Sequence, residues 1–164
     1  AHKAMEENNI STVSKRMLFA MYQKELSQPA KLFYALKIDS RKVGNLKNDN
    51  KDLIDDMLKI AGGNSLRVLQ SVNYLLESGY LTVGSVSAAP SGDSAIFHGL
   101  RMSAKGIDFV EGVANGDEDK MKQVGLVVKG DMNFSLELDS IFKAEASDLL
   151  GIKKIAEFFT NKNN

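Results

Sequence analysis

The chain has 164 residues, a formal net charge of zero, 43% hydrophobic residues, 26% charged residues and no cysteine. This composition is typical of a globular chain with one core and room for a small second one. The lack of cysteine excludes disulfides, thiolate metal sites and thiol catalysis. No segment approaches the roughly twenty apolar residues of a membrane span, and the N-terminus lacks the pattern of a signal peptide, so we expect a cytoplasmic protein with no membrane partner.

The N-terminal part of the chain predicts a flexible tail followed by a helix. The tail covers residues 1–10, and the helix begins at Ser11 or Thr12 and continues toward Leu26, with Pro29 ending it or opening the next element. Its apolar stripe consists of Val13, Met17, Leu18, Met21 and Tyr22. The apolar run 30–36 can extend this helix as a short second one.

Residues 37–50 predict a loop, because the segment is polar, basic and interrupted by Gly44. Arg41, Lys42 and Lys47 in this loop are candidates for contacts with DNA phosphates. The alternative is an insertion that has no role in binding.

Two helices joined by a short turn follow this loop. Asn50 caps the first helix, and its apolar face consists of Leu53, Ile54, Met57, Leu58 and Ala61. Gly62 and Gly63 end it, Asn64 caps the second helix, and Gly79 ends that one. A connection of about four residues is the length that a helix-turn-helix needs.

The second helix, residues 65–78, carries the functional prediction. A turn of about 100° per residue places one set of side chains toward the core: Leu66, Leu69, Val72, Asn73 and Leu76. The opposite side holds Arg67, Gln70, Ser71 and Tyr74. Hydrogen-bonding groups with one permanent cation suit a helix in the major groove of DNA. The alternative is an ordinary solvated helix face.

A hairpin and a closing helix complete this region. Residues 80–83 predict a strand, residues 89–93 a turn and residues 95–102 the returning strand. Ser103 then caps a helix whose inner face holds Ile107, Phe109 and Val110.

Two segments of this region are similar to the winged helix-turn-helix superfamily. Glu77 to Leu81 resembles the family's exit from the recognition helix into the wing, and Arg101 to Gly106 resembles its entry into the closing helix. The resemblance covers about residues 50–113. It implies an α+β fold with a winged helix-turn-helix domain over residues 11–113, a three-helix core and a wing hairpin. We expect double-stranded DNA as the partner, with Asn64 as a further contact residue and His98 and Arg101 as candidates for a wing contact. The alternative for His98 is a packing or surface role on its strand.

Residues 114–164 are expected to form a separate extension with a β-hairpin and helices. Asn115 to Asp119 predicts an acidic linker, and residues 124–128 and 132–138 predict the two strands of the hairpin. Helices over residues 140–150 and 152–159 follow. The apolar side chains of the terminal helix are Leu149, Ile152, Ile155, Phe158 and Phe159.

The apolar faces of this extension require a cover. We expect a homodimer that pairs through the C-terminal hairpin and helix, since a module that reads two half-sites gains affinity and length of recognition. The alternative is that the extension folds back on its own winged helix.

The sequence offers little for catalysis. His2 and His98 are the two histidines, and the chain has no phosphate-binding Gly-rich loop, no nucleophile elbow and no paired-histidine zinc motif. The acidic run at residues 115–119 lacks the order of a calcium loop. We therefore expect no enzymatic activity, no cofactor and no metal site.

Charge is distributed unevenly along the chain. Residues 1–48 contain nine Lys and Arg against four acidic residues, whereas residues 107–164 contain seven Lys against eleven acidic residues. Such asymmetry suits a protein that turns its N-terminal side toward a polyanion. The alternative is that the lysines only solvate helix faces.

Two functions agree with these features. The first is a DNA-binding, repressor-like transcriptional regulator that inserts the helix 65–78 into the major groove. The second is a winged-helix interaction module of a phage, plasmid or conjugation assembly with no direct DNA readout. Residues 83–99 contain no Lys or Arg, which favours the second. We favour DNA binding, because the helix-turn-helix spacing and the basic N-terminal half agree with each other.

Overall fold

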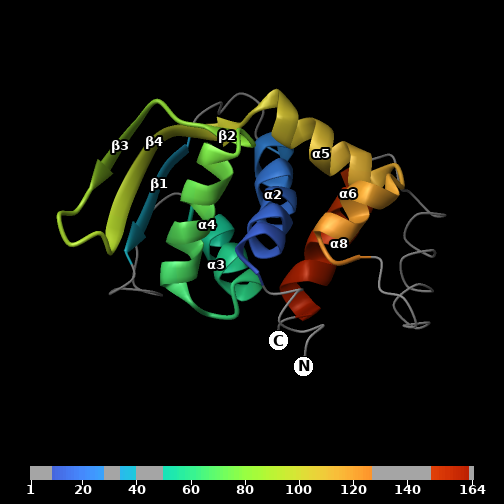
Figure 1. Cartoon of the computed structure of the whole chain (residues 1–164), viewed down its shortest axis with the longest axis horizontal. Coiled ribbons are helices and arrows are strands. Elements are labelled where there is room, and N and C mark those ends of the chain that lie inside the picture. Colours follow the sequence, from blue (N-terminus) through green and yellow to red (C-terminus); the bar gives the residue numbers. More distant parts are fainter. Residues whose placement is uncertain (1–8, 28–33, 40–49, 127–148, 163–164) are drawn as a thin grey trace.

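The computed structural model describes residues 9–27, 34–39, 50–126 and 149–162, and these residues form an α+β fold, as predicted. The helices are α2 (Ile10–Ser27), α3 (Lys51–Ile60), α4 (Ser65–Glu77), α5 (Ala104–Ala114), α6 (Glu118–Gln123) and α8 (Leu149–Lys162). The strands are β1 (Tyr34–Asp39), β2 (Leu81–Thr82), β3 (Ser85–Ala88) and β4 (Ser94–Met102). Figure 1 shows the sheet at one end of the molecule and α2 in the middle.

Helix α2 is the central element, because every residue from Thr12 to Tyr22 is buried. Helices α3 and α4 pack against it from one side and α5, α6 and α8 from the other (Figure 1). The side chain of Asn9 accepts a hydrogen bond from the backbone N–H of Thr12 at 2.9 Å and caps the helix. The predicted helix is confirmed, and its buried surface is much wider than the predicted stripe.

Two charged side chains of α2 are buried, and each donates a hydrogen bond to a residue in the C-terminal part of the chain. Arg16 is 1% exposed; its Nε donates to the carbonyl oxygen of Val124 at 2.9 Å, and its guanidinium lies 5.4 Å from the centre of the Phe159 ring. Lys15 is 8% exposed, and its Nζ donates to Oε1 of Gln123 at 2.7 Å. These bonds offset part of the cost of burying charge and connect α2 to α6 and α8.

The sheet is antiparallel, with β4 paired to β1 on one side and to β2 and β3 on the other. Strand β1 corrects the sequence analysis, which expected a helix over 30–36 and a loop from residue 37. Leu36 and Ile38 are buried and Lys37 is exposed, which is the alternation of a strand. Pairing with Phe97 and Ala95 of β4 decides the structure of this segment. The loop residues Arg41, Lys42 and Lys47 lie outside the described residues.

The helix pair follows the predictions closely, and β4 matches the predicted returning strand, whereas the strand predicted over residues 80–83 is shorter and is followed by β3, which was not predicted. Gly62 and Gly63 lie between α3 and α4 with φ of +68° and +84°, a conformation that favours glycine. The side chain of Asn64 accepts from the backbone N–H of Arg67 at 3.1 Å, so its capping role is confirmed. Asn50 holds the N-cap position of α3, but its side chain makes no capping hydrogen bond, so that detail is wrong.

The C-terminal part differs from the predicted separate extension. Ser103 caps α5 as predicted, and its Oγ accepts from the backbone N–H of Gly106 at 3.1 Å. The prediction of an acidic linker is wrong at its C-terminal end, because Asp117 caps α6. Its side chain accepts a hydrogen bond from the backbone N–H of Lys120 at 3.2 Å. Val124 to Leu126 do not form a strand. The rest of the predicted hairpin, like residues 140–148 of the predicted helix 140–150, lies outside the described residues.

Helix α8 packs on its own chain. Its apolar face (Ile152, Ile155, Ala156 and Phe159) is buried, and it contacts α2, α3 and α5. The rings of Phe19 and Phe159 meet edge to face with centroids 5.1 Å apart. The fold-back alternative therefore describes this helix, and its apolar face no longer argues for a dimer.

Candidate nucleic-acid interface

Helix α4 exposes a strip that differs from the predicted one. Leu66 is 46% exposed, and Gln70, Asn73 and Glu77 are exposed one after another at spacings of four and three residues. The buried side of α4 consists of Val68, Leu69, Ser71, Val72 and Leu75. The strip therefore runs the length of the helix on one side.

Three placements on α4 were wrong. Leu66 and Asn73 were expected in the core and are exposed, whereas Ser71 was expected to face outward and is 0% exposed. The cause is that α4 packs against α2, β1 and β2, which turns its buried side around the helix axis relative to the predicted apolar stripe.

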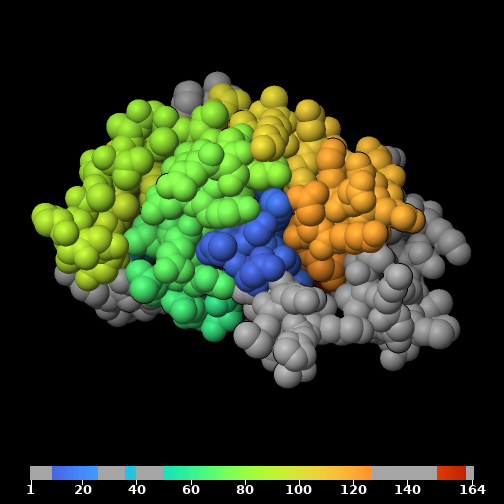
Figure 2. All heavy atoms as spheres, viewed as in Figure 1, coloured from blue at the N-terminus to red at the C-terminus, as the bar shows by residue number. Residues whose placement is uncertain are grey.

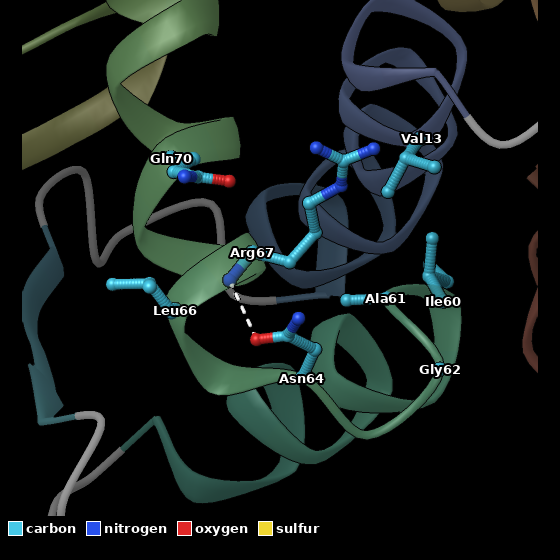
Figure 3. A pocket seen from close by; sticks show the side chains of 8 residues that line it. All are labelled: Val13, Ile60, Ala61, Gly62, Asn64, Leu66, Arg67 and Gln70. Carbon is cyan, nitrogen blue, oxygen red and sulfur yellow. Dashed lines mark hydrogen bonds between the residues drawn. The ribbon is translucent and has the colours of Figure 1, made fainter.

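A pocket of about 470 Å³ lies at the N-terminal end of α4. It brings together three predicted contact residues, Asn64, Arg67 and Gln70. Figure 3 shows the Arg67 side chain extending from α4 toward Val13 of α2, with Asn64 on the turn between α3 and α4. The remaining lining residues are Val13, Ile60, Ala61, Gly62 and Leu66.

The other predicted residues lie elsewhere. His98 is exposed and Arg101 half-buried on β4, where they pair with Ser85 and Thr82. Neither lines the pocket in the part of the chain that the structure describes. Tyr74 is half-buried two turns along α4 from Arg67, on the same side of the helix.

A cluster of hydroxyl and ammonium groups surrounds Tyr74, and sequence reasoning missed it. The hydroxyl of Ser11 lowers the pKa of the Tyr74 phenol by donating a hydrogen bond. Lys15, a hydrogen bond from Ser78, and Lys105 lower this pKa further, against the opposing effect of burial. We call these five residues the α4 flank. They come from α2, α4 with its C-cap, and α5, so no local sequence pattern could have revealed them.

The two ammonium groups of the α4 flank lie over one aromatic ring. Lys105 Nζ is 4.5 Å from the centre of the Tyr80 ring and donates to the carbonyl oxygen of Ser78 at 2.9 Å. Lys15 Nζ is 5.7 Å from the same centre. Burial and the nearby Tyr74 raise the pKa of Tyr80. The flank therefore stabilises negative charge on Tyr74, while Tyr80 stays neutral.

We expect a Tyr74→Phe variant to lose the earliest step of tyrosinate formation. On raising the pH, the absorbance at 295 nm of the wild type should begin to rise at a pH below the ordinary tyrosine pKa, because the pKa of Tyr74 is lowered. Tyr80→Phe is the matched control, because the pKa of Tyr80 is raised and its loss leaves the early step intact. An early step that survives in Tyr74→Phe would show that another phenol produces it.

Neither a metal centre nor a membrane span is found in the described ranges. No group of three or more His, Asp or Glu side chains in them is placed to hold a metal ion. None of the described helices is both long and apolar enough to cross a membrane.

Comparisons with protein-family models, curated proteins and solved structures give no match for this chain. The geometry of α4 and its surroundings is therefore the basis for assigning a function.

Proposed function

We propose that the chain is a DNA-binding transcriptional regulator in which residues 11–113 form a winged helix-turn-helix domain and α4 enters the major groove. The order of elements supports this fold: helix, strand, two helices joined by a glycine turn, wing strands and a closing helix. The wing is β3 with β4, which extends beyond the helices at the end of the molecule (Figure 1).

The exposed strip of α4 is the observation that carries the proposal. Gln70 and Asn73 carry amides, which suit the N6 and N7 edge of adenine. Leu66 offers an apolar contact for a thymine methyl group, and Glu77 can accept a hydrogen bond from the N4 amino group of cytosine. Figure 2 shows α4 on the open face of the molecule, between the wing and α2. Each side chain of the strip thus matches a chemical group on the edge of a base.

Arg67 has a different role in this arrangement. It is half-buried beside the strip and points toward α2, at the N-terminal end of the helix. A guanidinium at this position suits a guanine edge or a backbone phosphate. We assign a phosphate contact to Arg67, because the strip contains no Lys or Arg that could bind the DNA backbone.

The homodimer is retained as part of the proposal. Pairing of two copies would place two α4 helices on two half-sites about one turn of DNA apart. Static light scattering with and without duplex gives the molar mass, and a monomer in both states would remove the dimer from the proposal.

Fluorescence anisotropy on a random duplex at 50 and 200 mM salt tests the proposal. For roughly three phosphate contacts, the affinity should fall about forty-fold between these concentrations. Arg67→Ala should reduce the slope of log affinity against log salt by about one. Lys153→Ala on α8 is the matched control for a lost cation, and it should leave the slope unchanged, because Lys153 is exposed on a helix that does not pack on α4.

A protein-interaction module is the second candidate, and one observation favours it. The wing has no Lys or Arg between residues 83 and 99, β3 is exposed over its whole length, and Val86 is 46% exposed. Such a wing suits an uncharged protein surface better than a phosphate backbone. A wild-type protein that binds no duplex at either salt concentration would refute DNA binding and leave this candidate.

A further inference from the structure

We propose that the α4 flank is the phosphate-binding edge of the DNA interface and takes that role in place of wing residues 83–99, which contain no Lys or Arg. This inference rests on the proposed function, because it names the part of that interface which holds the backbone. It assigns a direct contact to the Lys105 ammonium and to the hydroxyl of Tyr74.

The first argument is the distribution of cations around α4. A protein that binds duplex DNA must neutralise phosphates beside the groove that its helix occupies. The wing lies on one side of α4, and its residues 83–99 contain no Lys or Arg, with Arg101 following near the end of β4. The other side of α4 has Arg67 near its start and Lys105 at its end. That side of α4 therefore offers cations at both ends of the helix, whereas the other neighbours of α4 carry the exposed Lys37 on β1 and the exposed Lys51 and Lys59 on α3.

The second argument is the geometry of the two ammonium groups. Lys105 and Lys15 both lie within 6 Å of one Tyr80 ring, and their hydrogen bonds go to a carbonyl oxygen and an amide oxygen. These partners are neutral, so the contacts hold the two ammonium groups without cancelling their positive charge. Lys15 is 8% exposed and contributes mainly to the local potential, whereas Lys105 is exposed and can reach a ligand.

The third argument is the row of donors along α4. Arg67, Tyr74 and Ser78 follow one another at spacings of seven and four residues, which places them on one side of the helix. The row spans about 16 Å at 1.5 Å per residue. Since successive phosphates of one strand advance about 3.4 Å along the duplex axis, the row can follow several phosphates. Hydroxyl and ammonium donors are the groups that hold phosphate oxygens in protein–DNA complexes.

Lys105→Gln tests the assignment. In anisotropy titrations we expect this variant to bind a random duplex about eight-fold more weakly at 0.1 M salt, with a salt slope reduced by about 0.9, the value for one lost phosphate contact. Lys105→Arg should retain most of the affinity, and Tyr74→Phe should weaken binding without changing the slope. Lys153→Gln on α8 is the matched control and should behave as the wild type. Preferences among base pairs should be the same in all variants.

The outcomes separate this inference from the proposed function. If the wild type binds duplex and Lys105→Gln matches Lys153→Gln, the flank assignment is wrong and DNA binding stands. If the wild type binds no duplex, a pyrophosphate titration followed through the backbone amide signals of Ser11, Ser78 and Lys105 decides. Shifts at these residues would support phosphate binding by the flank while refuting DNA binding, and unchanged signals would refute both.

Discussion

Gly106→Ala is expected to lower the free energy of unfolding by about 1–3 kcal/mol, the usual cost of overpacking. Gly106 lies in the first turn of α5, and a Cβ at this position would come closer than 3.0 Å to the carbonyl oxygen of Tyr80. That oxygen already accepts the backbone N–H of Ser103 at 3.0 Å. The collision is with backbone, so α5 or the start of β2 must move.

The consequences of that movement can be localised. Tyr80 packs edge to face on Phe109 of α5, with centroids 5.6 Å apart, and the Lys105 ammonium lies 4.5 Å from the centre of the Tyr80 ring. Displacement of α5 would separate these groups. We therefore expect Gly106→Ala to weaken the α4 flank as well as the fold, and chemical denaturation monitored by circular dichroism measures the loss of fold stability.

Gly112→Ala is the matched control for this substitution. Gly112 lies on the same helix, and a Cβ there would meet the side chain of Lys120, which can move aside. Alanine also favours the helix by about 1 kcal/mol over glycine. Stability equal to or above that of the wild type is expected for Gly112→Ala. A Gly106→Ala variant as stable as the wild type would contradict the close approach of α5 to Tyr80.

Phe159→Ala is expected to destabilise the protein by about 3–5 kcal/mol, as for other buried Phe residues. The Phe159 side chain is fully buried against Phe19, and the guanidinium of Arg16 lies over its ring. Truncation would leave a cavity and remove an apolar cover from a buried cation. Phe158→Ala is the control, since its half-buried side chain should cost less.

The same variant distinguishes folding back from pairing. If α8 packs within its own chain, Phe159→Ala should lower the denaturation midpoint without changing how that midpoint depends on protein concentration. A midpoint that rises with concentration in the wild type, and loses that dependence in Phe159→Ala, would show that α8 pairs between copies instead.

Local sequence signals predicted the elements whose ends are marked by glycines or by capping side chains. The glycines between α3 and α4, the caps Asn64 and Ser103, and the wing turn were recognised because each satisfies backbone groups within a few residues. Strand β1 was missed because its short apolar run is ambiguous until the pairing with β4 fixes its period. For β1, the pairing with a strand distant in the sequence determines the secondary structure that the local pattern left undecided.

The candidate site was predicted only in part for the same reason. Arg67 and Gln70 were found from helical periodicity, and the pocket at the start of α4 joins them with Asn64. Ser71 was misplaced because a small serine can be buried at a helix contact, so polarity alone does not decide its direction. The α4 flank depends on contacts between α2, α4 and α5, which are distant in sequence.

The burial of residues 12–22 of α2 has a consequence for any attempt to divide the chain. A fragment that stops before α8 would leave Arg16 and Phe19 without their cover, on the helix that supports α4. Minimal versions of this protein for crystallography or engineering therefore need α8, either in the same polypeptide or supplied as a complementing peptide. The C-terminal helix belongs to the scaffold that holds α2, and with it α4, in place.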